Sequence, residues 1–392
     1  MNTGTDAFTG NWNYPTTVRF GAGRISELAD VCRELGMTKP LLVTDPGLAG
    51  LDMVAAAVSA NNAAGVPTNV FSAIKPNPVS ANVIDGIKAF NDGGHDGVIA
   101  FGGGSALDAG KAVAFMAGQT RPIWDFEDIG DNWMRADAEA IAPVIAVPTT
   151  SGTGSETGRA AVVTNQETHT KKIIFHPLMM PLIVIADPEL VVGLPAHLTA
   201  ATGMDALAHC FEAYCEPGYH PMAEGIALEG MRLIHQWLAV AVRDGANIEA
   251  RSHMMAASAM GSTAFQKGLG AIHSLSHPVG AVLDAHHGLA NGVFFPYVMV
   301  FNRAAIAERM VLLARYLGLG EASFEGVLEW ILELRKEIGI PHTADALGVG
   351  PEHLDKLSAM AAEDPTAPSN PVPAGVDDMR KMYEAALTGK VG

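Results

Sequence analysis

Residues 96–110, DGVIAFGGGSALDAG, decide the fold expected for the first half of this chain. An apolar run typical of a buried strand passes directly into three glycines, and a helical pattern follows them. A helix that begins after such a loop presents free backbone N–H groups and the positive end of its dipole to a bound phosphate. The stretch therefore predicts a strand, a phosphate-binding loop and a helix, although a tight strand-to-helix turn without a ligand gives the same pattern.

The alternation of apolar strands with helical stretches continues on both sides of this segment, up to about residue 188. Near-continuous apolar strands separated by helices indicate a parallel sheet covered on both faces. Further strands are expected in PLLVTD at 40–45, TNVF at 68–71 and APVIAVPTT at 142–150, with VRFG at 18–21 at the edge and AAVVTN paired with KKIIF as a hairpin. We therefore predict an α/β domain with a Rossmann-like parallel sheet over residues 1–188.

The second half, residues 189–392, has a different sequence pattern. Long segments with helical periodicity follow one another and are separated by Gly, Pro and Asn residues. Helices are expected at 196–215, 221–243, 247–265, 304–317, 323–338 and 376–387. The sequence therefore predicts an all-α domain after the α/β domain.

Composition excludes several classes of partner. A chain of 392 residues that is 48% hydrophobic can bury the cores of two domains, and its net charge of −17 repels nucleic acid and anionic lipid. The N-terminal stretch has no export signal, and no run approaches about eighteen apolar residues. Three scattered cysteines, Cys32, Cys210 and Cys215, are expected to be free thiols. We expect a cytoplasmic protein that acts on small molecules.

Two further features bear on a nucleotide. The loop PTTSGTGSE at 148–156 also follows a strand, and either it surrounds a polar ligand with hydroxyls and glycines or it is an ordinary turn. In a doubly wound sheet both glycine loops lie at the carboxyl ends of the strands, where ligands bind. Asp45 ends the strand PLLVTD, and its carboxylate can accept hydrogen bonds from an adenosine ribose, which favours NAD over NADP. The same aspartate can instead start a turn before Pro46.

An aspartate and a histidine stand four residues apart in the apolar run GMDALAHCFEAY at 203–214. On a helix, Asp205 and His209 are neighbours on one face. The segment 268–292 adds a cluster of histidines, namely His273, His277, His286 and His287. Buried imidazoles so close together need a metal or a carboxylate network to satisfy their nitrogens.

These side chains together predict a divalent transition metal held by one carboxylate and several imidazoles. Nitrogen-rich ligation suits iron, zinc, cobalt or manganese better than calcium or magnesium. Spacing does not decide which histidines bind, since His273 and His277 share one helical face and the pair at 286–287 directs only one ring to a given point. Asp284 is either a partner of a ligand histidine or a solvated surface residue.

The motifs, taken in order, resemble those of the iron-containing (group III) alcohol dehydrogenases over nearly the whole chain. They are YPTTVRFGAG, VTDPGL, KPNP, GGGSALDAGK, PTTSGTGSE, ADPEL, GMDALAH, HSLSHPVGA and HHGLANG. The resemblance implies the dehydroquinate synthase-like, iron-alcohol-dehydrogenase fold, with a nucleotide-binding domain, a helical metal-binding domain and an active site between them.

The resemblance also implies roles for individual residues. It assigns metal ligation to Asp205, His209, His273 and His287, and it leaves His277 as a non-ligand histidine near the reacting centre. This set of four argues against the related glycerol dehydrogenase and dehydroquinate synthase branches, whose metal sites use three protein ligands. For the cofactor it assigns Asp45, Gly102, Gly103, Gly104, Ser105, Asp108, Thr149, Thr150 and Lys171.

The activity implied is a reversible hydride transfer between a primary or small alcohol, or a hydroxy acid, and NAD(P), with a metal polarising the substrate oxygen. The metal is Fe²⁺ or one of Zn²⁺, Mn²⁺, Co²⁺ and Ni²⁺, and NAD is favoured over NADP. A homodimer or higher homo-oligomer is expected. The alternatives are a 4-hydroxybutyrate-type dehydrogenase, a hydroxyacid-oxoacid transhydrogenase that keeps its nicotinamide bound, and a metal-dependent nucleotide-binding protein without enzymatic activity.

Overall fold

The computed structural model describes residues 16–168 and 170–392. Its contacts divide the described chain into two compact units, which meet in sequence between Leu194 and Pro195. The N-terminal segment in which no export signal was found, together with the first residues of the YPTTVRFGAG motif, lies outside the described residues.

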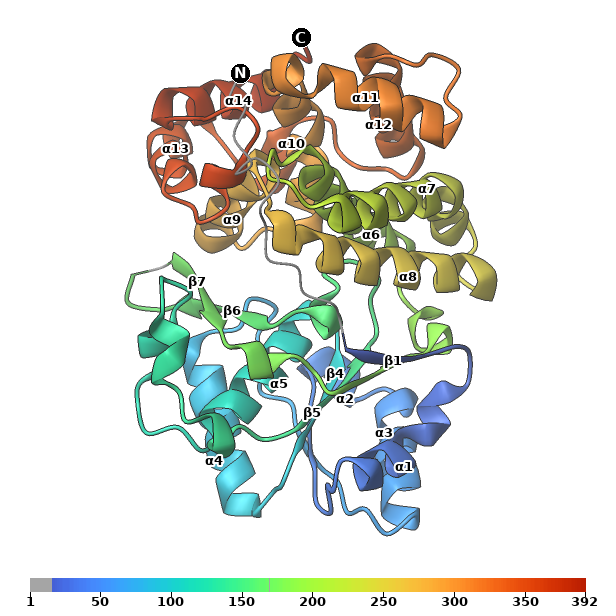
Figure 1. Cartoon of the computed structure of the whole chain (residues 1–392), viewed down its shortest axis with the longest axis vertical. Coiled ribbons are helices and arrows are strands. Elements are labelled where there is room, and N and C mark those ends of the chain that lie inside the picture. Colours follow the sequence, from blue (N-terminus) through green and yellow to red (C-terminus); the bar gives the residue numbers. More distant parts are fainter. Residues whose placement is uncertain (1–15, 169) are drawn as a thin grey trace. The chain divides into compact units, whose positions relative to one another are not determined.

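The first unit is built on a six-stranded parallel sheet with the strand order β1-β8-β5-β4-β2-β3 (Figure 1). The strands are β1 Thr17–Phe20, β2 Leu41–Val43, β3 Asn69–Phe71, β4 Val98–Gly102, β5 Val144–Pro148 and β8 Ile183–Ala186. Every residue of β4 and β5 is buried, as expected for central strands covered on both faces. The predicted parallel sheet, with residues 18–21 at its edge, is confirmed.

Helices cover the two faces of this sheet. They are α1 Leu28–Glu34, α2 Pro46–Ala49, α3 Asp52–Ala63, α4 Ser80–Gly93 and α5 Gly104–Met116. One face packs on α1 and α3, in a core that includes Val31, Val54 and, from β4, Ile99 and Phe101. The alternate β4 side chain, Ala100, faces α5 on the other side, because successive strand residues point to opposite faces.

Two smaller features complete the first unit. Strands β6 Ala160–Asn165 and β7 Thr170–Phe175 form the predicted antiparallel hairpin. Asp187, in the ADPEL motif, is fully buried and accepts hydrogen bonds from the backbone N–H groups of Gly23, Ile25 and Glu189. This carboxylate joins the segment after β1 to the segment after β8. The YPTTVRFGAG and ADPEL motifs are therefore held together by hydrogen bonds.

The second unit, residues 195–392, is entirely helical (Figure 1). Its α-helices are α6 Ala196–Cys215, α7 Pro221–Arg243, α8 Ile248–Ala264, α9 Ala271–Leu283, α10 His287–Phe301, α11 Arg303–Leu317, α12 Phe324–Glu337, α13 Leu354–Ala362 and α14 Val376–Thr388. The six predicted helices are confirmed to within a few residues. The helices expected from the sequence pattern leave out α10 and α13, and α9 enters only through the helical face that His273 and His277 were expected to share. Helices α9 and α10 contain internal prolines, and α13 is short.

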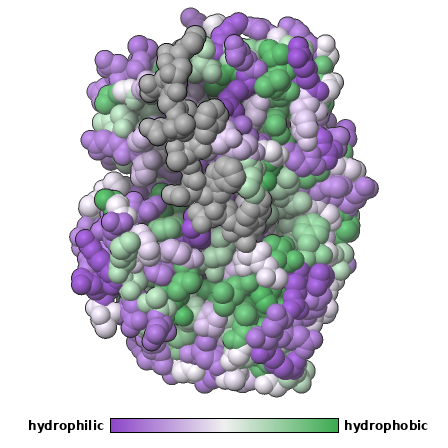
Figure 2. All heavy atoms as spheres, in the orientation of Figure 1, coloured by the Kyte–Doolittle hydropathy of each residue, from purple (hydrophilic) through white to green (hydrophobic). Residues whose placement is uncertain are grey.

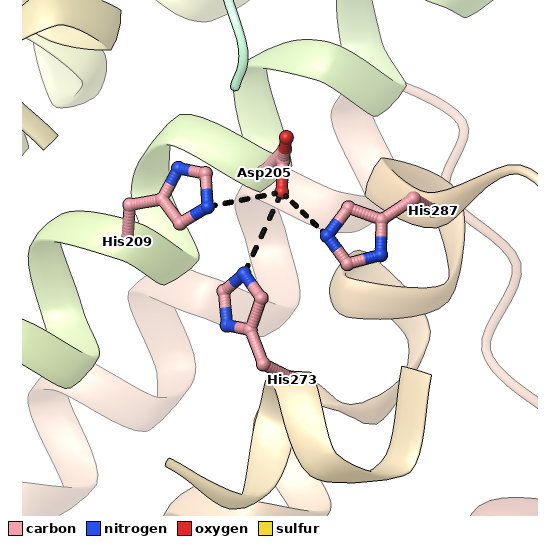
Figure 3. A group of neighbouring side chains, drawn as sticks. All are labelled: Asp205, His209, His273 and His287. Carbon is pink, nitrogen blue, oxygen red and sulfur yellow. Dashed lines mark ion pairs between the residues drawn. The ribbon is translucent and has the colours of Figure 1, made fainter. Parts of the chain in front are cut away.

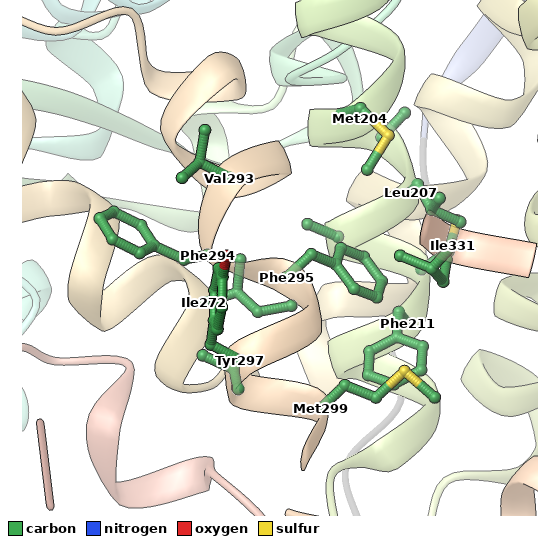
Figure 4. Packing of buried hydrophobic residues seen from close by; sticks show 14 of the residues in the cluster. Met204, Leu207, Phe211, Ile272, Val293, Phe294, Phe295, Tyr297, Met299 and Ile331 are labelled. Atoms are coloured by element: carbon green, nitrogen blue, oxygen red, sulfur yellow. The ribbon is translucent and has the colours of Figure 1, made fainter. Parts of the chain in front are cut away.

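The core of this unit is formed by α6, α10 and their neighbours (Figure 4). Phe211 of α6 packs against Phe295 of α10, with their ring centroids 4.7 Å apart. The apolar side chains that fix these helices therefore lie close to the residues that carry the metal-binding pattern.

Prolines inside α9 and α10 interrupt the backbone hydrogen bonding, since each lacks an N–H and clashes with the carbonyl four residues earlier. Near Pro278 the hydroxyl of Tyr383, on α14, donates to the carbonyl of Leu275 at 2.7 Å. Near Pro296 the buried guanidinium of Arg335 donates to the carbonyl of Val293 at 3.4 Å. Side chains from α14 and α12 thus contact the backbone of both proline-containing helices.

Cys32, Cys210 and Cys215 are buried free thiols, as expected. Burial raises the pKa of Cys210 to about 12, so its thiol stays protonated beside His209. Hydrophilic side chains cover much of the face drawn in Figure 2.

Within the described residues, no helix on its own has the length and apolar character of a membrane span. Helices α10 and α11 pass that test only when joined, and they are bent by 108° at their junction.

Candidate metal centre and nucleotide loops

Helix α6 places Asp205 and His209 together because their spacing of four residues brings them to one face. Both side chains are buried, with residue exposures of 2% and 5%. An isolated buried carboxylate is costly unless it is paired or binds a cation. The polar pair inside an apolar run therefore has to meet partners from other helices.

The partners come from α9 and from the first residue of α10 (Figure 3). The Oδ1 atom of Asp205 lies 3.7 Å from Nε2 of His209, 3.8 Å from Nε2 of His273 and 3.5 Å from Nε2 of His287. One ligand atom from each of the four residues lies within 4.8 Å of the other three. These are the four residues for which the family resemblance implied metal ligation.

A buried carboxylate fixes the orientation of His273. The Oε2 atom of Glu212 accepts a hydrogen bond from Nδ1 of His273 at 2.6 Å, and its Oε1 accepts one from the backbone N–H of Ile272 at 2.7 Å. Burial alone would lower the pKa of His273, but the carboxylates around it, Glu212 foremost, outweigh burial and raise it. In the neutral ring, which is the form that binds a metal, Glu212 holds the proton on Nδ1 and the lone pair of Nε2 is left for a cation.

Asn291 also reaches into this group. Its Nδ2 atom lies 2.7 Å from Oδ1 of Asp205, 3.2 Å from Nε2 of His273 and 3.3 Å from Nε2 of His287. The sequence reasoning named neither Glu212 nor Asn291. Both stand at helical spacings from ligand residues, three after His209 and four after His287, so the same neighbour rule includes them among its candidates without selecting them.

The chemistry of this donor set fits a divalent transition metal. Three imidazole nitrogens and one carboxylate oxygen converge in a buried place, and neutral imidazoles are good ligands for iron, zinc, cobalt, nickel and manganese. A carboxylate behind one imidazole is the usual outer partner of a metal-bound histidine. The residues present therefore fit the metal that the sequence predicted.

His277 lies one turn after His273 on α9, and its ring stacks on that of His287 with a centroid distance of 5.2 Å. Its Nδ1 atom is 2.9 Å from Oδ2 of Asp364. Burial would raise the pKa of Asp364, but His277 and the hydrogen bonds from Thr366 outweigh it and hold that pKa below its ordinary value. The carboxylate is thus ionised and orients the His277 ring.

His286 and Asp284 lie at the ends of neighbouring helices. The Nδ1 atom of His286 accepts a hydrogen bond from the backbone N–H of Leu289 and caps α10. Asp284 is exposed and ends α9 in a left-handed conformation, with a φ of 53°. Glu212 is a carboxylate outside the ligand set that contacts a ligand histidine, His273.

In the first unit, the two glycine loops lie side by side at the carboxyl ends of β4 and β5. The backbone N–H of Thr149 donates to the carbonyl of Gly102 at 2.9 Å. A Cβ atom on Gly104 would lie 2.6 Å from Cγ2 of Thr153, so any other residue at this position would force the Thr153 side chain to shift. Gly103 caps α5 and Gly104 begins it, while Ser105, in its first turn, donates to the carbonyl of Pro76. The first turn of a helix therefore borders both loops, as the phosphate-loop interpretation expects.

Asp45 starts a turn and keeps one oxygen beside the glycine loop. Its Oδ1 atom accepts hydrogen bonds from the backbone N–H groups of Gly47 and Leu48 and caps α2, which is the turn-starting role. Its other oxygen, Oδ2, lies 3.6 Å from the place where a Cβ of Gly102 would stand. The second oxygen is therefore beside the glycine loop, and its hydrogen-bonding capacity is not used by the cap.

Asp108 and Lys111 of α5 hold the second glycine loop. The Asp108 carboxylate accepts hydrogen bonds from the Ser155 hydroxyl at 2.5 Å and from the backbone N–H of Val162 at 3.0 Å. The fully buried ammonium of Lys111 donates to the carbonyls of Ser155 and Ala160. Lys111 was not singled out from the sequence, because a lysine is ordinarily solvated.

The remaining predicted cofactor residues lie nearby in the first unit. Thr149 is buried and Thr150 half-buried at the end of β5. Lys171 is half-buried on β7, opposite Thr164 of β6. The pairing of Thr164 with Lys171 gives the hairpin register that the sequence left open.

Comparisons with known proteins agree over nearly the whole chain. The family model "Iron-containing alcohol dehydrogenase" matches residues 15–188, and "Fe-containing alcohol dehydrogenase family, C-terminal" matches residues 199–387. The chain is 37% identical to a 4-hydroxybutyrate dehydrogenase of Cupriavidus necator, over 95% of this chain and 99% of that protein. It is 34% identical to an NAD-dependent methanol dehydrogenase of Bacillus methanolicus, over 96% and 100%. The crystal structure of a 1,3-propanediol oxidoreductase superposes with a TM-score of 0.91 at 34% identity, covering 97% of this chain and 100% of that one.

Proposed function

The chain belongs to the iron-containing alcohol dehydrogenase family, and on that premise we propose that it is an NAD-dependent alcohol dehydrogenase whose metal is held by Asp205, His209, His273 and His287. The observation that carries the proposal is the convergence of these four side chains, from three helices, to within 4.8 Å of one another. Residues 1–188 serve as the nucleotide-binding domain and residues 189–392 as the metal-binding domain.

The metal is Fe²⁺ or another divalent ion that accepts the same ligands, namely Zn²⁺, Mn²⁺, Co²⁺ or Ni²⁺. When bound, it supplies a Lewis acid that polarises the oxygen of an alcohol or aldehyde, while NAD supplies the hydride acceptor. The protein's own contribution is to hold the ligands ready. Glu212 keeps the proton of His273 on Nδ1, so that Nε2 is free to bind.

His277 is the proposed catalytic residue that moves the proton of the alcohol. Its Nδ1 atom is engaged by Asp364, which leaves Nε2 as the atom that accepts or returns the proton. Asp364 is itself held by the N–H and hydroxyl of Thr366. The pair resembles the carboxylate–imidazole arrangement by which many enzymes orient a general base.

The cofactor is assigned to the loops of the first unit. Gly102, Gly103, Gly104 and Ser105 receive the pyrophosphate at the start of α5, and the free oxygen of Asp45 receives the adenosine ribose. A carboxylate at that position repels a 2′-phosphate, which is why NAD is proposed rather than NADP. Thr149, Thr150 and Lys171 contact the nicotinamide half, and Asp108 acts through its hydrogen bonds to the second loop.

The proposed substrate is a primary or small alcohol. A second candidate, a 4-hydroxybutyrate-type dehydrogenase, is favoured by the 37% identity to such an enzyme over 384 residues. A homodimer or higher homo-oligomer is also proposed, since Val18 and Phe20 on the edge strand β1 are 40% exposed, and exposed edge strands invite pairing.

The proposal is tested by comparing three alanine variants for metal content and turnover. We expect Asp205→Ala and His273→Ala to lose the metal, and His277→Ala to keep it while turning over more slowly. Equal metal loss in all three would contradict the division into ligands and proton carrier. Assays of alcohols and hydroxy acids with NAD and NADP then separate the two candidate substrate classes, and the absence of any turnover would refute the activity.

A further inference from the structure

Asn291 is a polar side chain that touches three of the four proposed ligands and is not itself one of them. It lies on α10, four residues after His287 and therefore on the same helical face. It is fully buried. Its Nδ2 atom is closer to Oδ1 of Asp205, at 2.7 Å, than any of the ligand imidazoles is.

The surroundings of Asn291 fix the orientation of its amide. Asp205 offers only acceptor oxygens, and His273 presents a bare Nε2 because its proton is on the Nδ1 that faces Glu212. An amide oxygen turned toward these atoms would meet acceptors and be repelled. The donor end must therefore face the ligand set. The Oδ1 atom points elsewhere and has no hydrogen-bond donor among residues 16–168 and 170–392.

We propose that Asn291 is a positioning residue of the metal centre, which fixes the liganding oxygen of Asp205 and closes the side of the site bordered by Asp205, His273 and His287. This inference rests on the proposed binding of a metal by the four residues. A carboxylate oxygen has more than one lone pair, so Oδ1 can accept from Asn291 and still bind a cation. The hydrogen bond stops the carboxylate from rotating away.

The distances from Nδ2 of Asn291 to the ligand atoms show why it closes one side of the proposed metal site. Nδ2 lies at a hydrogen-bond distance of 2.7 Å from Oδ1 of Asp205. It lies in contact with Nε2 of His273 and of His287, at 3.2 and 3.3 Å, and the single lone pair of each of these nitrogens is left for the cation. A water molecule needs the same space, so none can enter on that side while the amide is there. Any further ligand of the metal, including the substrate oxygen, has to approach from another side.

Two variants separate these roles in the full chain. Asn291→Leu fills nearly the same volume but cannot donate, and Asn291→Ala removes both the donor and the volume. The matched control is Asn61→Leu, a buried asparagine of the first unit whose Nδ2 donates to Thr68. Co²⁺ affinity is measured by competition with a chelator, and coordination by the visible d–d absorption of the Co²⁺-loaded protein.

We expect both Asn291 variants to bind Co²⁺ about 10–100-fold more weakly than the parent, as is typical when an outer partner of a ligand is removed. Asn61→Leu should bind it as the parent does. The d–d bands should weaken only in Asn291→Ala, because a water then enters and raises the coordination number.

Parent-like affinity in either Asn291 variant, or parent-like bands in the alanine variant, would overturn the assignment. A parent chain that binds no Co²⁺ would instead overturn the proposed metal centre itself.

Discussion

Replacing Glu212 by glutamine tests how the structure prepares a ligand. Glu212 accepts two hydrogen bonds, one from the backbone of Ile272 and one from His273. Glutamine has only one oxygen, and the backbone N–H of Ile272 cannot change its character. The amide nitrogen must therefore face Nδ1 of His273, and the clash of two donors is relieved only if the imidazole proton moves to Nε2, the atom that would bind the metal.

The size of the effect follows from the bond that is lost. A hydrogen bond to a charged group contributes about 1.5–3 kcal/mol, which corresponds to a roughly 10- to 150-fold loss of affinity. Losses of about 10–100-fold are usual when outer partners of metal ligands are changed. We therefore expect Glu212→Gln to bind Zn²⁺ one to two orders of magnitude more weakly.

The assay is competition for Zn²⁺ against a chelator, with thermal unfolding measured in parallel. The control is Glu229→Gln, which changes a partly exposed carboxylate on α7 that pairs with Arg232. A folded Glu212→Gln protein that binds Zn²⁺ as tightly as the parent would refute the idea that Glu212 fixes the tautomer of His273. Equal losses in the two variants would refute it as well.

Three further predictions concern the first unit. Asp45→Ser should raise the preference for NADP over NAD by about tenfold, equivalent to about 1.4 kcal/mol, and an unchanged ratio of kcat/KM values would contradict the ribose assignment. Burial raises the pKa of Glu156 to about 7 from an ordinary value of 4.5, so the stability linked to its protonated form is full below pH 4.5 and is lost as the pH rises through about 7. Glu156→Gln should flatten this dependence, which amounts to about 3 kcal/mol for a rise of the pKa from 4.5 to about 7. A parent-like pH slope of the unfolding free energy in Glu156→Gln between about pH 5 and about pH 7 would contradict the raised pKa of Glu156. Asp187→Asn should lower the unfolding free energy by about 1–3 kcal/mol, because the new amide nitrogen meets the N–H of Ile25. It should leave Zn²⁺ affinity unchanged, since the metal ligands lie in the other unit. A lowered Zn²⁺ affinity or an unchanged unfolding midpoint would contradict a purely structural role of Asp187.

Local patterns in the sequence were enough to predict most of the fold. Apolar strands bounded by glycine loops specify a parallel sheet, and the four-residue spacing of Asp205 and His209 already places them on one helical face. The pattern failed at α9 and α10, where Pro278 and Pro296 interrupt the helical signal. Neighbouring helices supply hydrogen bonds there, which no local pattern can reveal.

The surroundings of the candidate site were harder to predict than its ligands. Glu212 and Asn291 stand at helical spacings from ligand residues, but many polar residues do, and only the packing of the helices selects these two. Asp364 is 87 positions from His277 and comes from a different element, so sequence spacing carries no information about their contact. The burial of Lys111 could not be predicted from sequence spacing either, because it depends on carbonyl groups that a separate loop brings to the ammonium.

Tyr383 limits how far the candidate metal centre can be reduced to a smaller protein. The ligands come from α6, α9 and α10 alone, which suggests that a three-helix fragment would suffice. Yet α9 receives the Tyr383 hydroxyl near its proline, and the Tyr383 ring packs edge-on against Phe294 of α10, with centroids 5.3 Å apart. A graft that omits α14 keeps every ligand but loses both contacts of Tyr383. We expect it to retain less Zn²⁺ on dialysis than a graft that includes α14.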